Sequence, residues 1–263
     1  MDLSAPVGVV EYEPAEMVVR AGAGTTCAAL EAVLAEHGQM VPLDPADPDR
    51  AAVGSVLAAG LSGIRRLRYG PVRDTLLEAT MVLADGTTVK AGGPVVKNVT
   101  GYDLCRLFVG SMGTLGILVE CVLRCQPRPA VARWLRSSVP GAADPFETRQ
   151  RLFRPSSILW DGSLTWVLLE GRAAEVDAER AALGAGWEEV EGPPPLPVAG
   201  RESLRPSALR GLTGEFVAEV GVGTVHRPYE VAPVPVDPSA RALHERVKRL
   251  FDPEGRMNPG RSV

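Results

Sequence analysis

The sequence has 263 residues, of which 45% are hydrophobic and 23% charged, and a formal net charge of −4. These values are typical of a soluble globular protein with one large domain or two modest ones. The negative charge argues against a nucleic-acid-binding protein, because such proteins present a basic face to phosphates.

Neither a membrane span nor a secretion signal is visible. No stretch approaches the roughly 20 apolar residues needed to cross a bilayer. The N-terminal segment MDLSAPVGVVEYEP lacks the basic start and apolar core of a signal peptide. We therefore expect a cytoplasmic protein, at most peripheral to the inner face of a membrane through a partner.

The cysteines and histidines show no metal-binding pattern. No two cysteines form a C-x-x-C pair, and the three histidines stand far apart, so we expect neither a zinc nor an iron–sulfur site. We expect the cysteines to be buried and reduced, with Cys121 and Cys125 on one face of a strand. The residues concerned are Cys27, Cys105, Cys121, Cys125, His37, His226 and His244.

Residues 1–129 show alternating strand and helix patterns. A strand at 17–19 leads into a helix that Thr25 or Thr26 caps and Gly38 ends. A short strand (40–43), a small-residue helix or turn (51–63) and a hairpin (76–93) follow; Asp85 and Gly86 are expected to supply the positive φ angles of its turn. A short helix over about 102–109 then precedes a strand over about 116–124.

Residues 130–238 indicate a second, smaller α+β unit. The patterns predict a strand, a helix near 146–153, a hairpin over 157–170 and a helix near 174–185. Two strands near 215–226 follow a loose linker, EGPPPLPVAGRESLRPS. A helix over 239–251 and a turn-rich tail close the chain, so the fold class expected is α+β.

Two glycine-rich segments are candidates for phosphate-binding loops. The first, with Gly22 and Gly24 between a strand and a helix, is typical of a dinucleotide fingerprint, but Cys27 stands where the third glycine belongs and no further βαβ unit follows. In the second, KNVTGYDLCRLFVGSMGTLG, the order is helix, loop, strand, whereas phosphates bind at a helix N-terminus. Gly110 is then either a helix cap beside a tight turn, or part of a loop whose glycines let backbone amides approach a ligand.

A third constellation consists of Ser55, Ser62-Gly63, Arg68-Tyr69-Gly70 and Arg73-Asp74. Its small residues could admit a flat ligand, with Tyr69 or the backbone near Gly70 at the ligand's edge. A basic surface loop with an Arg–Asp pair explains the same residues, and the pattern alone favours that interpretation.

Taken in order, these segments resemble one known family. The segments LSGIRRLRYGPVRD, VVKNVTGYDLCRLFVGSMGTLG and FDPEGRMNPG are similar to the FAD-binding family of the vanillyl-alcohol oxidase type, also called PCMH-type. Within that family, they resemble the E subunit of bacterial glycolate oxidase. The resemblance covers residues 8–129 and the last dozen residues, and is weak between them.

The resemblance implies a two-lobed PCMH-type FAD-binding domain over 1–129, a small cap-like α+β domain over 130–238, and a helix and tail over 239–263 that return to the flavin domain. It implies FAD as the cofactor, lying between the lobes, with the cap over the substrate side. It matches the family's second flavin-binding loop to Asp44, Pro45, Val53, Gly54 and Ser55, and the segment beside the isoalloxazine to Ser62, Gly63, Tyr69 and Gly70. It matches the loop that contacts the nucleotide through backbone atoms to Gly113, Gly116 and Ile117, and the tail asparagine to Asn258.

The sequence departs from the family pattern in two ways. The family carries a further N-terminal lobe whose glycine-rich loop cradles the FAD pyrophosphate, whereas this sequence starts with a segment similar to the one that follows that lobe. We therefore expect a truncated chain, a site that a partner completes, or weak or lost FAD binding. The family's hydroxy-acid dehydrogenases also use clustered histidines and a carboxylate for a metal ion. The scattered histidines here predict no metal site and no catalytic residue.

The function implied is that of an oxidoreductase subunit. The chain would be the FAD-binding subunit of a glycolate oxidase-like complex that oxidises a 2-hydroxy acid to a 2-oxo acid. Its expected partners are a larger flavoprotein subunit and an iron–sulfur subunit, to which electrons pass. The alternatives are a flavin-free subunit that docks its catalytic relatives, and a stand-alone 2-hydroxy-acid dehydrogenase.

Overall fold

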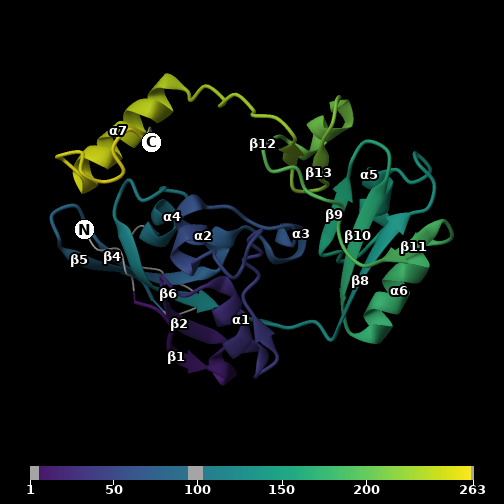
Figure 1. Cartoon of the computed structure of the whole chain (residues 1–263), viewed down its shortest axis with the longest axis horizontal. Helices are drawn as coiled ribbons and strands as arrows, with labels where there is room; N and C mark the ends of the chain where they lie inside the picture. The colour runs from purple at the N-terminus through teal and green to yellow at the C-terminus, as the bar shows by residue number, and fades with distance from the viewer. Residues whose placement is uncertain (1–5, 94–102, 262–263) are drawn as a thin grey trace. The chain divides into compact units, whose positions relative to one another are not determined.

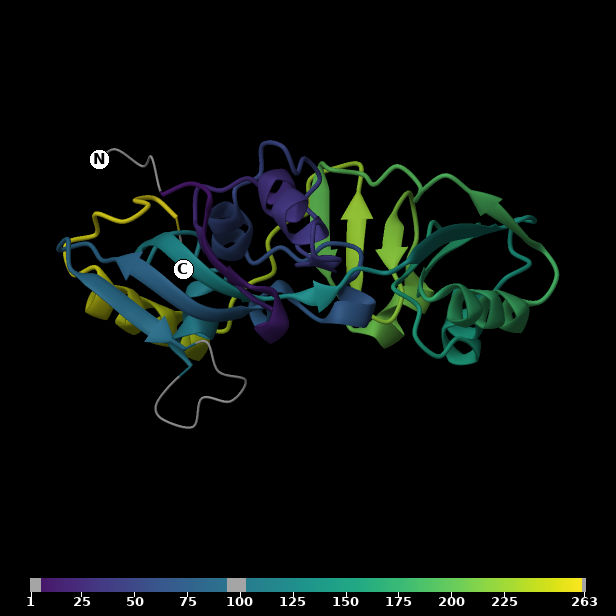
Figure 2. The same cartoon turned by 90° about the horizontal axis from the view of Figure 1, so that it is seen from below.

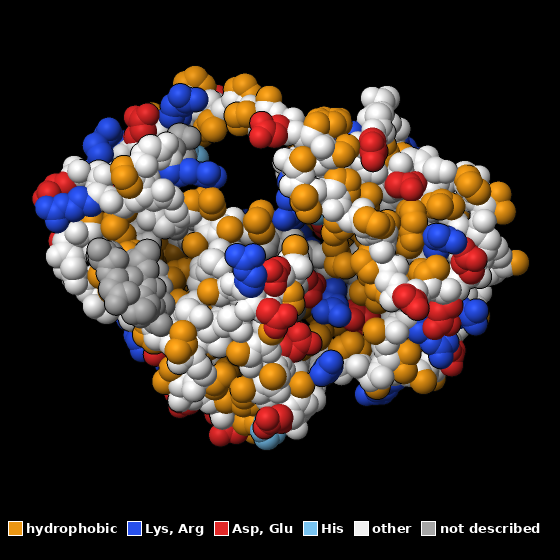
Figure 3. All heavy atoms as spheres, viewed as in Figure 1, with side chains coloured by type: hydrophobic (Ala, Val, Ile, Leu, Met, Phe, Trp, Pro, Cys, Tyr) orange, Lys and Arg blue, Asp and Glu red, His pale blue; other side chains and the backbone are white. Residues whose placement is uncertain are grey.

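The computed structural model describes residues 6–93 and 103–261 of the chain. They form two compact units, which are described separately: the first comprises residues 1–63, 71–128 and 235–263, and the second 64–70 and 129–234. The predicted segment KNVTGY, at 97–102, lies outside the described residues. Figure 3 shows acidic and basic side chains interspersed over the visible face of each unit.

The first unit is built on a five-stranded antiparallel sheet with the order β1-β2-β6-β4-β5 (Figure 1). Alternate residues of these strands, such as Val19 and Ala21, enter one apolar core, as the two-residue period of a strand requires. The strands are β1 (Val9–Glu13), β2 (Val18–Gly22), β4 (Leu76–Val82), β5 (Thr88–Gly92) and β6 (Ile117–Arg124); a separate pair joins β3 (Gln39–Met40) to β7 (Gln126–Pro127).

Four helices pack with this sheet. Helix α1 buries Leu30 and Leu34, one turn apart, and the Thr26 side chain caps it by accepting from the Ala29 amide at 3.2 Å, which confirms the predicted start. The rings of Phe108 on α4 and Phe251 on α7 pack edge to face, with their centroids 5.8 Å apart. The helices are α1 (Cys27–Ala35), α2 (Val53–Ala59), α4 (Leu104–Phe108) and α7 (Pro238–Phe251); the 3₁₀ helices are η1 (Pro14–Glu16) and η2 (Val72–Asp74).

The sheet of the first unit also carries a charged network across neighbouring strands. Arg20 on β2 donates from Nη1 to Oε1 of both Glu78 and Glu120 at 2.8 Å, and Lys90 Nζ lies 2.9 Å from Glu78 Oε1. Burial alone would raise the pKa of Glu78, but hydrogen bonds from Lys90 and Arg20 lower it below its ordinary value. The buried carboxylate is therefore ionised and paired.

The second unit contains a seven-stranded antiparallel sheet with the order β11-β8-β10-β9-β13-β14-β12. Strand β10 is buried along its whole length because apolar clusters cover both faces of the sheet. Its strands are β8 (Val131–Ser137), β9 (Ser157–Trp160), β10 (Thr165–Gly171), β11 (Trp187–Val190), β12 (Gly200–Ser203), β13 (Val217–Glu219) and β14 (Thr224–Arg227).

Helices α5 and α6 cover the same face of this sheet (Figures 1 and 2). Apolar side chains of both helices enter one core cluster with the sheet. Val176 and Leu183 of α6 are buried against Val167 and Leu169 of β10. The helical elements of this unit are α3 (Arg66–Tyr69), α5 (Pro145–Arg151), α6 (Ala173–Leu183) and the 3₁₀ helix η3 (Pro206–Gly211).

The predicted α+β fold class is confirmed, but two local predictions are wrong and two strands were not predicted. The segment predicted as a loose linker contains β12, and β1 and β11 were not predicted. In the β4–β5 hairpin, only Gly86 has a positive φ, of 86°, whereas Asp85 does not. The turn instead forms because the Gly86 amide donates to Leu83 O at 3.0 Å and Asp85 Oδ1 accepts from the Thr87 amide at 2.8 Å.

Candidate cofactor site

The first unit contains a cleft of about 590 Å³, a size typical of ligand sites. Four segments of the chain border it: the end of β2 and its turn, the first turns of α2, the loop from α4 to β6, and the C-terminal tail. Its lining is mostly small and apolar and consists of Ala23, Gly24, Ala52, Gly54, Ser55, Ala58, Met112, Gly113, Gly116, Ile117, Leu118, Arg256, Met257 and Asn258.

Gly54 lets helix α2 approach the end of β2. Its amide donates to the carbonyl oxygen of Ala23 at 2.8 Å. A Cβ atom on Gly54 would lie 2.7 Å from the Cβ of Ala23 and 3.0 Å from its carbonyl oxygen, closer than side chains pack. A side chain at this position would therefore push one wall of the cleft away from the other.

The loop between α4 and β6 is held against α2 by its backbone. The amides of Gly110 and Met112 donate to the carbonyls of Leu57 and Ala58 at 3.0 and 2.8 Å. Met112 and Gly113 have φ values of 54° and 70°, so two successive residues adopt the left-handed conformation. Such a conformation is costly for Met112 and persists because the surrounding hydrogen bonds fix it.

Gly113 and Gly116 have different local roles. A Cβ on Gly116 would lie 2.8 Å from Met81 Cε and 3.1 Å from Val82 O, so this glycine lets the loop pack on β4. A Cβ on Gly113 would meet no atom within 4 Å, and the Gly113 amide donates to none of the described residues. Gly113 thus leaves a backbone donor available at the wall of the cleft.

The C-terminal tail is clamped to this loop by a buried carboxylate and a lysine. Asp252, 2% exposed, accepts from the amides of Arg256 and Met257 at 2.9 and 2.7 Å and from Lys248 Nζ. The same Nζ donates to Thr114 O at 2.7 Å and Met257 O at 2.8 Å. Burial opposes ionisation of Asp252, but the hydrogen bonds from Lys248 and the two amides prevail and lower its pKa to about 2.

The structure brings six predicted site residues to one cleft: Gly54, Ser55, Gly113, Gly116, Ile117 and Asn258. The other predicted residues of the first unit do not line it. Val53 is fully buried in the core, and Ser62 Oγ accepts from the Val72 amide at 2.9 Å. Asp44 has a φ of 47° and is half-buried like Pro45, and a Cβ on Gly63 would lie 2.1 Å from the Asp44 Cβ.

Tyr69 and Gly70 belong to the second unit. Tyr69 ends helix α3, and Gly70, with a φ of 82°, donates its amide to Arg66 O at 2.9 Å. Their predicted places beside the isoalloxazine stay predictions.

Sequence reasoning missed Arg256 and the Lys248–Asp252 clamp. Arg256 contributes a cation to the cleft, two residues before the predicted Asn258. The i, i+4 spacing of Lys248 and Asp252 was a signal for an ion pair on one helix face, but not for its link to Thr114.

The cysteines are confirmed as free and buried. Burial raises the pKa of Cys27, Cys105 and Cys125 to about 11 and that of Cys121 to about 12, so all four are neutral thiols at physiological pH. Cys121 and Cys125 contribute to the same core, but β6 ends at Arg124, so only Cys121 lies in the strand on which both were predicted. Across residues 6–93 and 103–261, no group of three or more His, Cys, Asp or Glu side chains is placed to hold a metal ion.

The cleft fits a flavin nucleotide in three respects. Its small side chains and apolar floor suit a flat ring, and its volume suits a large ligand. The Gly113 amide is available to an anionic oxygen, and the exposed guanidinium of Arg256, which pairs with Glu254, adds a cation to the lining. None of the described helices is long and apolar enough to cross a bilayer.

Comparison with known families agrees with this interpretation. The model described as "FAD binding domain" matches residues 1–92, and the one described as "FAD linked oxidases, C-terminal domain" matches residues 207–262. Fold and cleft therefore define an FAD-binding domain. The chain is similar to the FAD-linked oxidases over both matched regions, and these matches support FAD as its cofactor.

The chain resembles several curated proteins. It is 37% identical over 196 residues to glycolate oxidase subunit GlcE of Escherichia coli (strain K12), which covers 73% of this chain and 55% of that protein. It is 35% identical to the mitochondrial D-2-hydroxyglutarate dehydrogenase of Bos taurus, over 53% of this chain and 26% of that protein. It is 40% identical to glycolate oxidase subunit GlcD of Bacillus subtilis (strain 168), over 37% of this chain and 21% of that protein. The chain thus spans about half the length of the first relative and about a quarter or less of the other two.

Among solved structures, an alkyldihydroxyacetonephosphate synthase matches with a TM-score of 0.58 at 19% identity, covering 71% of this chain and 42% of that one. At this identity, the match shows a shared fold.

Proposed function

We propose that this chain is the FAD-binding subunit of a glycolate oxidase-like complex that oxidises a 2-hydroxy acid to a 2-oxo acid. The observation that carries the proposal is the 37% identity to GlcE over 73% of the chain. The convergence of six predicted residues on one cleft supports it. The resemblance to a D-2-hydroxyglutarate dehydrogenase supports the same class of substrate.

In this proposal, the cleft holds the cofactor through groups of the first unit. The Gly113 amide and the Arg256 guanidinium bind anionic oxygens, while Ala23, Ala58 and Leu118 exclude water from an apolar ring. Asn258 and the Lys248–Asp252 pair hold the tail in place. When bound, FAD would supply the two-electron oxidising capacity that conversion of a 2-hydroxy acid to a 2-oxo acid needs.

The test is direct binding of FAD to the purified chain. Flavin absorbance and fluorescence report the amount bound, and Arg256→Gln should weaken binding about tenfold if Arg256 contacts a phosphate. Arg249→Gln is the matched control because Arg249 is exposed on α7 and does not line the cleft. Equal affinities of the two variants for FAD would show that Arg256 does not contact the cofactor.

The proposed partners are a larger flavoprotein subunit and an iron–sulfur subunit, which would take the electrons onward. Two separate glycolate oxidase subunits among the relatives, GlcE and GlcD, support a complex of more than one chain. The complex would lie in the cytoplasm, at the inner face of the membrane through these partners. Turnover of glycolate with an artificial acceptor only when the partners are added would support this arrangement; turnover by the isolated chain would support a stand-alone dehydrogenase instead.

One observation favours the alternative of a flavin-free docking subunit. Arg256 is the one basic side chain among the described residues that line the cleft, whereas a pyrophosphate normally needs several donors. A chain that binds its partners but neither retains FAD nor gains thermal stability from it would establish that alternative.

A further inference from the structure

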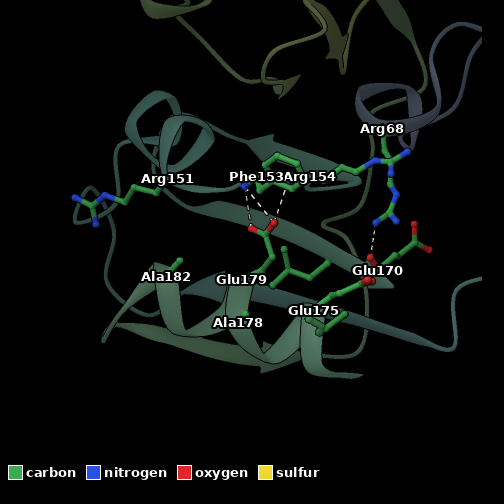
Figure 4. Close-up of a pocket in the computed structure, with 11 residues that line it drawn as sticks. Arg68, Arg151, Phe153, Arg154, Glu170, Glu175, Ala178, Glu179 and Ala182 are labelled. Carbon is green, nitrogen blue, oxygen red and sulfur yellow. Dashed lines mark hydrogen bonds between the residues drawn. The ribbon is translucent and has the colours of Figure 1, made fainter. Parts of the chain in front are cut away.

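A second cavity, of about 420 Å³, lies wholly within the second unit (Figure 4). The segment after α5, the end of β10, one face of α6 and a side chain of α3 border it. Its lining combines arginines, glutamates and apolar side chains: Arg68, Arg151, Phe153, Arg154, Leu169, Glu170, Glu175, Val176, Ala178, Glu179 and Ala182.

All three glutamates of this cavity are engaged in holding its walls. Glu179 accepts from the amides of Phe153 and Arg154 at 2.9 to 3.1 Å, as Figure 4 shows. Glu175 accepts from the Arg172 amide at 3.0 Å in the first turn of α6. Glu170 is buried and accepts from Arg65 Nε at 3.1 Å. Glu179 and Glu175 are therefore engaged by donors of the protein itself, whereas Oε2 of Glu170 is buried and accepts no hydrogen bond from the described residues.

Two of the arginines retain donors that the protein does not use. Arg68 Nη1 donates to the backbone oxygen of Glu170, but its buried Nε donates to none of the described residues. The guanidinium of Arg154 forms no ion pair or hydrogen bond with any residue in the described ranges. Burial and the charge of Glu170 raise the pKa of Tyr69, and the charges of Arg68, Arg65 and Arg154 oppose that rise.

The two guanidiniums share one end of the cavity. In Figure 4, the side chain of Arg154 extends toward Arg68, whereas Arg151 points away from the cavity. Arg65, Arg68 and Arg154 leave an excess of positive charge over the single carboxylate of Glu170 at this end of the cavity. An anion between Arg68 and Arg154 would offset that excess.

Apolar groups form the rest of the cavity. Leu169 and Val176 are almost fully buried at its floor, and Phe153, 89% exposed, stands at its mouth. Ala178 and Ala182, one turn apart on α6, leave space that larger side chains would fill. An exposed phenylalanine beside an apolar floor favours a ligand with a hydrocarbon part.

We propose that this cavity binds a small amphipathic organic anion, with its charged group between Arg68 and Arg154 and its hydrocarbon part against Leu169, Val176 and Phe153. Bidentate guanidinium contacts suit a carboxylate or a phosphate. This cavity shares no lining residue with the cofactor cleft, because its lining residues all belong to the second unit.

The test uses the full chain and methyl NMR with phenylacetate as the probe, phenylacetamide as its uncharged match and phenyl phosphate as the second anion. Phenylacetate should cause saturable shifts at the methyl groups of Leu169, Val176 and Ala182 but not at Leu118 in the cofactor cleft. Phenylacetamide should bind at least about tenfold more weakly, because it lacks the charge. The ratio of phenyl phosphate to phenylacetate affinity then identifies the preferred head group.

Three variants localise the binding. Arg154→Gln should weaken phenylacetate binding about tenfold, and its exposed side chain makes the variant safe for folding. Ala182→Trp should abolish binding by filling the cavity, and Arg180→Gln, on α6 outside the lining, should leave it unchanged. Equal binding of acid and amide, an unaffected Arg154→Gln, or no shifts at millimolar probe would overturn the proposal.

Discussion

Asn258 donates a hydrogen bond from Nδ2 to the carbonyl oxygen of Met112 at 2.6 Å, joining residues 146 positions apart. Both residues have positive φ, 44° for Asn258 and 54° for Met112. Asparagine adopts this conformation at less cost than most residues, so it suits a position that needs both the backbone turn and the side-chain donor. The tail and the loop thus fix one another at the border of the cleft.

Replacing Asn258 should loosen the tail. Asn258→Ala removes the hydrogen bond and leaves an alanine in the left-handed conformation, so we expect a loss of about 2 kcal/mol in the free energy of unfolding. Asn258→Gly removes only the hydrogen bond, so it should lose about 1 kcal/mol. Urea unfolding of the three proteins measures both effects. Identical midpoints for all three would show that the contact adds no stability.

The Asp252 clamp predicts a specific dependence of stability on pH. A carboxyl whose pKa is lower in the folded state stabilises the fold above its unfolded pKa and loses that effect as the pH falls through the folded pKa. The pKa of Asp252 is about 2 against an ordinary 3.8, so its contribution is complete above about pH 4 and lost between about pH 4 and pH 2.

Asp252→Asn should therefore be about 3 kcal/mol less stable than the natural protein at pH 7, given hydrogen bonds from Lys248 and two amides. The difference should shrink toward pH 2. Denaturant unfolding at pH 7, 4 and 2 measures it, with Asp49→Asn, an exposed aspartate, as the control. A difference that stays constant across this range would contradict the assigned role of the carboxylate.

Gly54→Ala should displace helix α2 from β2. The added Cβ would lie 2.7 Å from the Ala23 Cβ, and overpacking of this kind costs about 1–3 kcal/mol, more than the gain in helix propensity. Gly192→Ala is the matched control, since its Cβ would meet no atom within 4 Å. Thermal unfolding should show a lower midpoint for Gly54→Ala alone. A midpoint equal to that of Gly192→Ala would mean that the two walls can separate freely.

The four thiols should resist alkylation in the folded protein. The thiolate is the reactive form, and burial raises the pKa of each cysteine to about 11 or 12. Mass spectrometry after iodoacetamide treatment at pH 7.5 should find the native chain unmodified and the urea-unfolded chain modified at all four cysteines. Rapid labelling of any one thiol in the native chain would indicate local opening near it.

Local signals predicted much of the fold. Thr26 caps α1 as expected, and the strand of the SMGTLGILVECVL segment lies at the centre of its sheet. Strand β12 (Gly200–Ser203) was missed because GRES has no apolar alternation; pairing with β14 makes it a strand. The tail clamp was missed because Lys248 reaches Thr114 across 134 residues, and helix spacing says nothing about such a contact.

The glycine segment that resembled a phosphate loop shows how far sequence reasoning reaches. The predicted order of helix, loop and strand excluded a phosphate site at a helix N-terminus. The structure agrees, because Gly110 follows the C-terminal end of α4 and has a φ of 84°. That Gly113 is open to the cleft while Gly116 packs on Met81 depends on β4, a strand distant in sequence. Spacing alone could not separate these two roles.

The most direct test of the central claim is a titration of the purified chain with FAD, followed by flavin fluorescence and thermal unfolding. We predict saturable binding of one FAD per chain, with a rise in unfolding temperature. Gly113→Trp should abolish that rise: its Cβ would meet no protein atom within 4 Å, so the ring would enter the cleft, while the φ of 70° lowers the stability of the variant with and without FAD. A chain that shows neither bound flavin nor thermal stabilisation at any FAD concentration would contradict the assignment of this cleft as the FAD site.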